Sequence, residues 1–300
     1  MKRAYATPLA FKEALEARLR ERAALEGRAI NRVRQLLVME RYLARVFACV
    51  DSAVLKGGIV MELRLDRARA TKDVDLRLVG RPEELLTRLQ AAGRLDLGDH
   101  LSFEVRADPT HPVIEADGLR YDGQRFRAEA RLAGRPYGSV FGVDVAVGEP
   151  LVGRPQEIEG SEVLAFIGVP APRFLAYPIA THIAEKLHAY TLPRPRPNSR
   201  VKDLPDIALL AQAGAVAGPV LSEAIASTFA NRATHPVPAL LPDPPEGWVP
   251  VYARMAAEEG LPWSDLPDLV SAVRAFLDPV LAGQPRAWNP ARWRWEDRER

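Results

Sequence analysis

The chain has 300 residues, and 47% of them are hydrophobic, which is enough for a sizeable core and favours two lobes over one. Its 41 basic and 39 acidic residues give a formal net charge of only +2, which excludes a uniformly basic nucleic-acid-binding protein and restricts any basic surface to local clusters. The single cysteine, Cys49, excludes a disulfide within the chain.

Neither a membrane segment nor a secretion signal is expected. No apolar run approaches the roughly 20 residues that are needed to cross a bilayer. Residues 1–32 are charged and lack the apolar segment of a signal peptide. We therefore expect a cytoplasmic protein without a membrane partner.

The N-terminal part predicts a mixture of helices and strands. Alternating apolar residues predict a short strand over 53–55 and antiparallel strands over 101–106, 124–132 and 139–147, and helical spacing predicts helices over 9–26, 32–49, 59–65 and 83–92. Gly57 and Gly58 separate the first strand from the helix 59–65. Glycine leaves the amides at a helix start open to phosphate oxygens, although the pair also suits an ordinary strand-to-helix turn.

Two alternating carboxylates follow this helix. Side chains of a strand point alternately to its two faces, so Asp73 and Asp75 lie on one face, and Val74 and Leu76 on the other. Transfer of a nucleotidyl group needs divalent metal ions held by two or three converging carboxylates. A single D-x-D pair is also common among solvated residues of half-exposed strands, so further acids are needed to support a metal site.

A third acid is predicted on the strand 139–147. Asp144 lies in an alternating run whose face also carries Gly142 and Ala146, and these small residues leave room beside it. The alternative is an exposed aspartate on an edge strand. Glu149 is the nearest substitute if Asp144 points elsewhere.

The C-terminal part predicts mainly helices, over residues 179–190, 204–212, 219–230, 251–259 and 266–281, with proline-rich connections at 192–197 and 236–250. Lys186 lies beside the apolar stripe of the first of these helices. Its stem could cover apolar surface while the ammonium reaches water. Asp203, taken alone, would be an ordinary helix cap.

The order of strand, K-G-G, short helix and D-V-D resembles the nucleotidyltransferase fold of the polymerase-beta type. More narrowly, L-K-G-G at 55–58 with R-x-T-x-D-h-D at 69–75, and E-K-L-x-A at 185–189 with R-x-K-D-x-x-D-h at 200–207, resemble the AbiEii/AbiGii toxin family, which includes the MenT toxins. The resemblance implies an α+β protein, with a mixed sheet flanked by helices in a nucleotidyltransferase domain, 1–160. A mainly helical domain, 161–300, would contribute Lys186 and Asp203 to the site.

The resemblance also implies roles for individual residues. Two Mg²⁺ ions would be held by Asp73, Asp75 and Asp144, and the nucleoside triphosphate would be bound by Lys56, Gly57, Gly58, Arg69, Thr71 and Lys186. Asp203 would act near the acceptor or the lysine and is favoured over Asp206, although spacing alone does not decide between them. Further candidates are Glu185, Arg200, Lys202 and Asp206.

The function implied is that of the toxin in a type IV-like toxin–antitoxin system, which transfers nucleotides to RNA, with the tRNA 3′ acceptor end favoured and a separately encoded antitoxin as partner. A nucleotidyltransferase acting on a small hydroxylated molecule, of the antibiotic-modifying type, is the alternative. A non-catalytic nucleotide-binding module is disfavoured because all three expected carboxylates are present.

Two features bear on the acceptor. Basic residues cluster near both motifs, at Arg64, Arg67, Arg69 and Lys72 and at Arg194, Arg196, Arg200 and Lys202, which favours RNA. The first cluster could equally bind only the triphosphate, because a small acceptor would need no further charge. Near the C-terminus, Trp288, Trp293 and Trp295 alternate with arginines and could stack on bases, but docking onto the helical lobe is the favoured interpretation.

Overall fold

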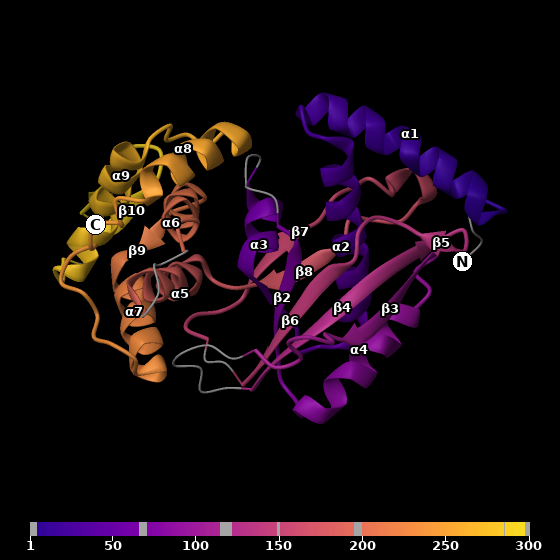
Figure 1. Cartoon of the computed structure of the whole chain (residues 1–300), viewed down its shortest axis with the longest axis horizontal. Coiled ribbons are helices and arrows are strands. Elements are labelled where there is room, and N and C mark those ends of the chain that lie inside the picture. The colour runs from indigo at the N-terminus through magenta and orange to yellow at the C-terminus, as the bar shows by residue number, and fades with distance from the viewer. Residues whose placement is uncertain are drawn as a thin grey trace.

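A mixed sheet forms the framework of the N-terminal lobe (Figure 1). The computed structural model describes residues 5–65, 71–114, 122–148, 151–194, 200–284 and 286–297. Within these residues, eight strands belong to this sheet: β1 (Val54–Lys56), β2 (Asp73–Leu78), β3 (Leu101–Ala107), β4 (Asp122–Leu132), β5 (Arg135–Pro136), β6 (Phe141–Val147), β7 (Gln156–Glu159) and β8 (Arg173–Ala176). Their order is β3-β4-β6-β2-β1-β8-β7, and β5 pairs with β4.

The register of the central strands separates an apolar face from a polar one. β2 runs parallel to β6 and antiparallel to β1. β4 lies antiparallel between β3 and β6, as the alternation in the sequence predicted. Val74 and Leu76 of β2 and Val143 of β6 are fully buried in the core. The intervening polar residues of both strands therefore lie on the opposite face of the sheet.

The helices described in the N-terminal lobe are α1 (Pro8–Glu26), α2 (Ile30–Cys49), α3 (Gly57–Arg64) and α4 (Leu85–Arg94). α2 and α4 pack against each other and contribute to the same hydrophobic core as the sheet. α1 contacts α2, runs at an angle to it across the edge of the lobe (Figure 1), and buries Phe11, Leu15 and Leu19. Gly57 is the first residue of α3, which therefore begins two residues before the predicted position.

The C-terminal lobe is mainly helical, as predicted. Its described elements are α5 (Ile179–Thr191), α6 (Asp203–Gln212), α7 (Gly218–Arg232), α8 (Trp248–Glu259), α9 (Leu266–Leu281) and a small sheet of β9 (Val216–Ala217), β10 (Ala287–Asn289) and β11 (Arg294–Glu296). Trp288 Nε1 donates to the carbonyl of Ala211, and Trp295 Nε1 to that of Phe276, both at 2.8 Å. These tryptophans therefore dock onto the helical lobe, which was the favoured interpretation.

The N-terminal sheet continues beyond residue 160, because it includes β8. β8 pairs in parallel with β1 and so extends the N-terminal sheet. Phe174 and Ala176 belong to the N-terminal core, whereas Ala180 already belongs to the core of the helical lobe. None of the helices within the described ranges is both long enough and apolar enough to cross a bilayer.

Candidate active site

The turn between β1 and α3 brings the backbone directly against Asp75. Gly57 has a φ of +72°, and a β-carbon built on it would overlap the Asp75 carboxylate. Glycine satisfies both conditions, because it adopts positive φ readily and has no side chain. Gly58 follows in the first turn of α3 and is buried. Gly57 therefore provides space for an acid, a role that the sequence pattern did not reveal.

The three predicted carboxylates lie on one face of two adjacent strands. In the parallel pairing of β2 and β6, Asp75 is opposite Asp144, and Asp73 is opposite Gly142. Neighbouring strands are about 4.8 Å apart, which brings the side chains of such pairs close together. A β-carbon on Gly142 would overlap the Asp73 carboxylate, so this glycine provides the space that its small size had suggested.

The electrostatic environment of Asp75 favours a cation. Burial, together with the negative charges of Asp144 and Asp73, raises the pKa of Asp75 to about 6. The positive charges of Lys56 and Lys186 lower the pKa of Asp75, but the net shift of this pKa is still a rise. Carboxylate oxygens are preferred ligands of hard divalent ions, and such an ion would stabilise the ionised form of this acid.

A neighbouring arginine engages the third carboxylate. Arg125 of β4 is opposite Asp144 in the sheet and donates to both of its oxygens, from Nε at 2.7 Å and from Nη2 at 2.6 Å. Across the ranges that the structure describes, no group of three or more His, Cys, Asp or Glu side chains is close enough to hold a metal ion together. The acids thus share a face without forming a closed cluster. Arg125 was not among the predicted site residues, although alternation along the strand 124–132 places it on the polar face.

Across from the sheet, Lys186 of α5 is buried between two acids of α6. Its Nζ donates to Asp206 Oδ2 at 2.5 Å and lies 3.7 Å from Asp203 Oδ1. Asp203 instead accepts hydrogen bonds from Arg200, at 2.6 and 3.1 Å. The direct partner of the lysine is therefore Asp206, while Asp203, which the resemblance favours for a role near the acceptor or the lysine, lines the pocket. Both acids are fully buried in the first turn of α6.

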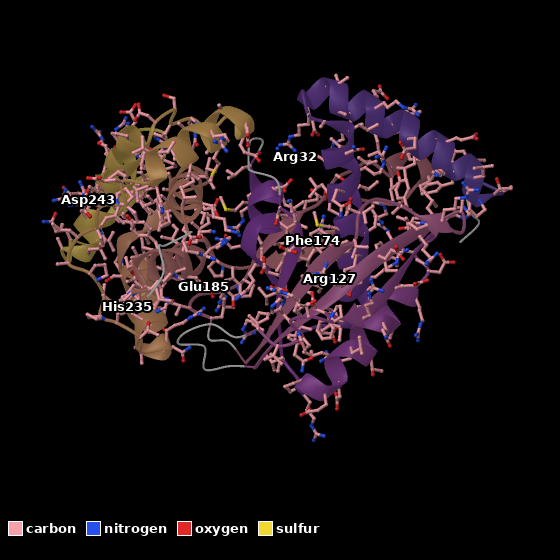
Figure 2. All side chains as sticks on the ribbon, in the orientation of Figure 1. Arg32, Arg127, Phe174, Glu185, His235 and Asp243 are labelled. Carbon is pink, nitrogen blue, oxygen red and sulfur yellow. The ribbon has the colours of Figure 1, made fainter. Side chains whose placement is uncertain are left out.

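A pocket of about 280 Å³ lies between Asp75 of the sheet and the Lys186–Asp203 group of the helical lobe, so its lining comes from both lobes. The predicted residues that line it are Lys56, Gly57, Gly58, Asp75, Glu185, Lys186, Arg194, Arg200, Lys202 and Asp203. Lys56 Nζ lies 3.6 Å from Glu185 Oε1, which links the turn before α3 to α5. Figure 2 shows Glu185 on the side of the helical lobe that faces the sheet.

Other predicted residues lie outside this lining. Thr71 does not line the pocket; its hydroxyl donates to the carbonyl of Asp73 at 3.1 Å, and its N–H donates to Glu62. Asp73 and Asp144 extend the acidic face next to Asp75. Arg64 of the predicted basic cluster lines a different cleft, where its Nη2 donates to the carbonyl of Tyr177 at 2.9 Å. The predicted positions Arg67, Arg69, Glu149 and Arg196 fall outside the described residues.

The lining also includes residues without a predicted role, among them His182 and Arg232. His182, one helical turn before Lys186, is buried rather than at the surface, and burial together with the Lys186 charge lowers its pKa well below the usual value. Its Nδ1 has no hydrogen-bond partner among the described residues. Arg232, the last residue of α7, reaches the pocket from a helix far away in sequence, so no local pattern could have identified it.

Comparisons with known proteins agree with this architecture. A family model described as nucleotidyl transferase AbiEii toxin, type IV TA system, matches residues 41–289. MenT4, a nucleotidyltransferase toxin from Mycobacterium tuberculosis, has a similar structure, with a TM-score of 0.56 and 15% identity over 93% of this chain and 92% of its own. JHP933 from Helicobacter pylori has a TM-score of 0.49 and 14% identity over 85% of this chain and 94% of its own. No curated protein matches the chain in sequence. At 15% identity, the likeness to MenT4 is one of fold.

Proposed function

The chain belongs to the AbiEii family of nucleotidyl transferase toxins of type IV toxin–antitoxin systems. We propose that it transfers a nucleotide from a nucleoside triphosphate to RNA, and that the tRNA 3′ acceptor end is the favoured target. The observation that carries this proposal is the pairing of Asp75 with Asp144, beside Asp73, next to a pocket that also contains Lys186. Family membership implies a separately encoded antitoxin.

We propose that Asp73, Asp75 and Asp144 hold two Mg²⁺ ions. The fit rests on their oxygen donors, on the raised pKa of Asp75, and on the space that Gly57 and Gly142 leave beside the acids. When bound, Mg²⁺ neutralises triphosphate charge and favours ionisation of the attacking hydroxyl. Arg125 donates to both oxygens of Asp144 and would compete with a cation for this carboxylate.

Lys186 would serve as a fixed positive charge for the triphosphate. Its hydrogen bond to Asp206 restricts the ammonium to one position, and the Arg200–Asp203 pair does the same for a guanidinium at the pocket. Arg194, Lys202 and Arg232 line the same pocket and add positive charge. Oriented charges of this kind stabilise phosphoryl transfer without covalent participation of the protein.

The reaction itself is an in-line displacement. An acceptor hydroxyl oxygen forms a bond to the α-phosphorus, the bond to the pyrophosphate oxygen breaks, and the hydroxyl proton passes to solvent or to a nearby base. The protein contributes mainly by positioning the reactants and stabilising the developing charge. Each of the three aspartates should therefore be nearly indispensable.

The choice of RNA as acceptor rests on the local basic charge at the pocket, because the net charge of the whole chain is only +2. The test is incubation of the protein with total RNA, Mg²⁺ and each α-labelled nucleoside triphosphate, beside an Asp73→Ala/Asp75→Ala control. Label in a tRNA-sized band that is absent in the control is the expected result. Transfer only to a small hydroxylated molecule would contradict RNA as the acceptor, and binding of triphosphate without any transfer would contradict the catalytic proposal.

A further inference from the structure

A second, larger cleft of about 930 Å³ lies at the opposite end of α3 from the pocket. It lies where α1, α2 and α3 of the N-terminal lobe approach the end of α8, and Figure 2 shows Arg32 at this junction. Two buried glutamates line the cleft, Glu40 of α2 and Glu62 of α3. Burial raises the pKa of each, so each carboxylate must be held by specific partners.

Glu62 is bonded to the chain segment that leads into the acidic strand. Its carboxylate accepts a close hydrogen bond from the Thr71 N–H. Thr71 in turn is tied to Asp73, because its hydroxyl lies 3.1 Å from the Asp73 carbonyl and 3.5 Å from the Asp73 nitrogen.

Arg32 connects Glu62 to the helical lobe. Its guanidinium lies 3.7 Å from Glu62 Oε2 and donates to Glu259 Oε2 at 3.0 Å. Glu259 is the last residue of α8, so one arginine of α2 contacts acids from both lobes. The side chain of Glu62 is only 2% exposed, and that of Arg32 is 23% exposed, so solvent screens this contact only partly.

We propose that Glu62 is a positioning residue, which holds Thr71 and thereby the strand with Asp73 and Asp75, and that Arg32 couples this position to Glu259 of the helical lobe. The inference rests on the proposed function, because it assigns to Asp73 and Asp75 the metal-holding role. An acid displaced by about 1 Å can lower a turnover rate by about 10²-fold, so a contact two residues away is sufficient to affect catalysis.

The first experiment compares Glu62→Ala, Glu62→Gln and Glu40→Ala. Glu40 is a matched control, because it is a buried glutamate of the same cleft that accepts hydrogen bonds from the nitrogen and hydroxyl of Ser161, away from the acidic strand. Glu62→Ala is expected to lower kcat for RNA nucleotidyl transfer by about tenfold to 10²-fold, with KM for the triphosphate changed by less than about twofold. Glu62→Gln keeps an acceptor for the Thr71 N–H and should recover most of kcat.

Hydrogen exchange provides a readout that does not depend on catalysis. Glu62→Ala should accelerate exchange of amides in residues 71–76, whereas Glu40→Ala should leave them unchanged. Unaltered exchange at 71–76, with kcat equal to that of Glu40→Ala, would overturn the proposal. If the unmodified protein transfers no nucleotide, the proposed function fails, and exchange at 71–76 still decides whether Glu62 positions the strand.

A second pair of variants tests the coupling to the helical lobe. Glu259→Ala is expected to accelerate exchange at residues 71–76, though less than Glu62→Ala. Glu258→Ala, which replaces the exposed neighbour on α8, is the control and should have no effect. Equal exchange in these two variants would show that Glu62 acts without the helical lobe and would overturn that part of the proposal.

Discussion

Asp75 lies directly against the backbone of Gly57, so that a β-carbon at residue 57 would overlap its carboxylate. This contact joins the start of α3 to the middle of β2. It makes the position of Asp75 depend on a residue that contributes no functional group of its own. Substitution of Gly57 should therefore affect the acidic face selectively.

Gly57→Ala is expected to lower nucleotidyl transfer by more than about 10²-fold, because the added methyl group must displace Asp75. Gly27→Ala is a suitable control, since Gly27 also has a positive φ, +63°, but nothing lies within 4 Å of its added β-carbon. The control should lose about 1 kcal/mol of unfolding free energy and keep its activity. Initial rates and urea denaturation measure the two effects. Equal activities in the two variants would contradict the steric argument.

Arg125→Gln should strengthen binding of Mn²⁺ to the nucleotide-free protein by about tenfold, because loss of two charge-assisted hydrogen bonds leaves Asp144 without its cation. Paramagnetic resonance of free Mn²⁺ measures the affinity. Arg131→Gln is the matched control on the same strand, where the arginine pairs with Glu104 and Glu129. Weaker binding in Arg125→Gln than in this control would show that Arg125 supports the cation site rather than competing with it.

Asp206→Ala should reduce the free energy of unfolding by about 3 to 5 kcal/mol, because it leaves the buried Lys186 ammonium without its closest partner. Asp203→Ala should cost less, since the side chain of its partner Arg200 is 36% exposed and can turn to water. Guanidinium denaturation distinguishes the two. A Lys186→Met/Asp206→Leu double variant should recover stability but lose nucleotidyl transfer. Equal losses for the two single variants would mean that Lys186 exchanges freely between the acids.

Stability should fall as the pH is lowered from about 6.5 to about 4. Burial, with the charges of Arg232 and His235, lowers the pKa of His188 from 6.5 to about 4, so the unfolded chain binds a proton in this window that the folded protein does not. The stabilisation is complete above pH 6.5, is lost as the pH falls through the window, and amounts to at most about 3 kcal/mol. Urea denaturation at several pH values should give a flatter profile for His188→Gln. A control at the exposed His111, His111→Gln, should keep the original slope; if both variants keep it, His188 is not the responsible group.

Local patterns were sufficient to predict the parts of the fold that depend on neighbouring residues. Alternation predicted that Asp73 and Asp75 share one face, and that Asp144 in the strand 139–147 shares a face with Gly142 and Ala146, because side chains of a strand alternate whatever the strand pairs with. Helical spacing predicted the lobe that contains Lys186. The roles assigned to these residues remain predictions, which the variants above address.

Contacts between distant segments were decided only by the tertiary structure. The parallel pairing of β2 with β6, the Arg125–Asp144 pair and the arrival of Arg232 at the pocket each depend on how whole elements pack, which no local period encodes. Packing also made Asp206 the direct partner of Lys186, although both candidate acids occupy the first turn of one helix. The motifs of this chain therefore specified which chemical groups are present, and the packing of the two lobes determined which of them meet, because a distance of a few ångströms between side chains is a property of the folded chain.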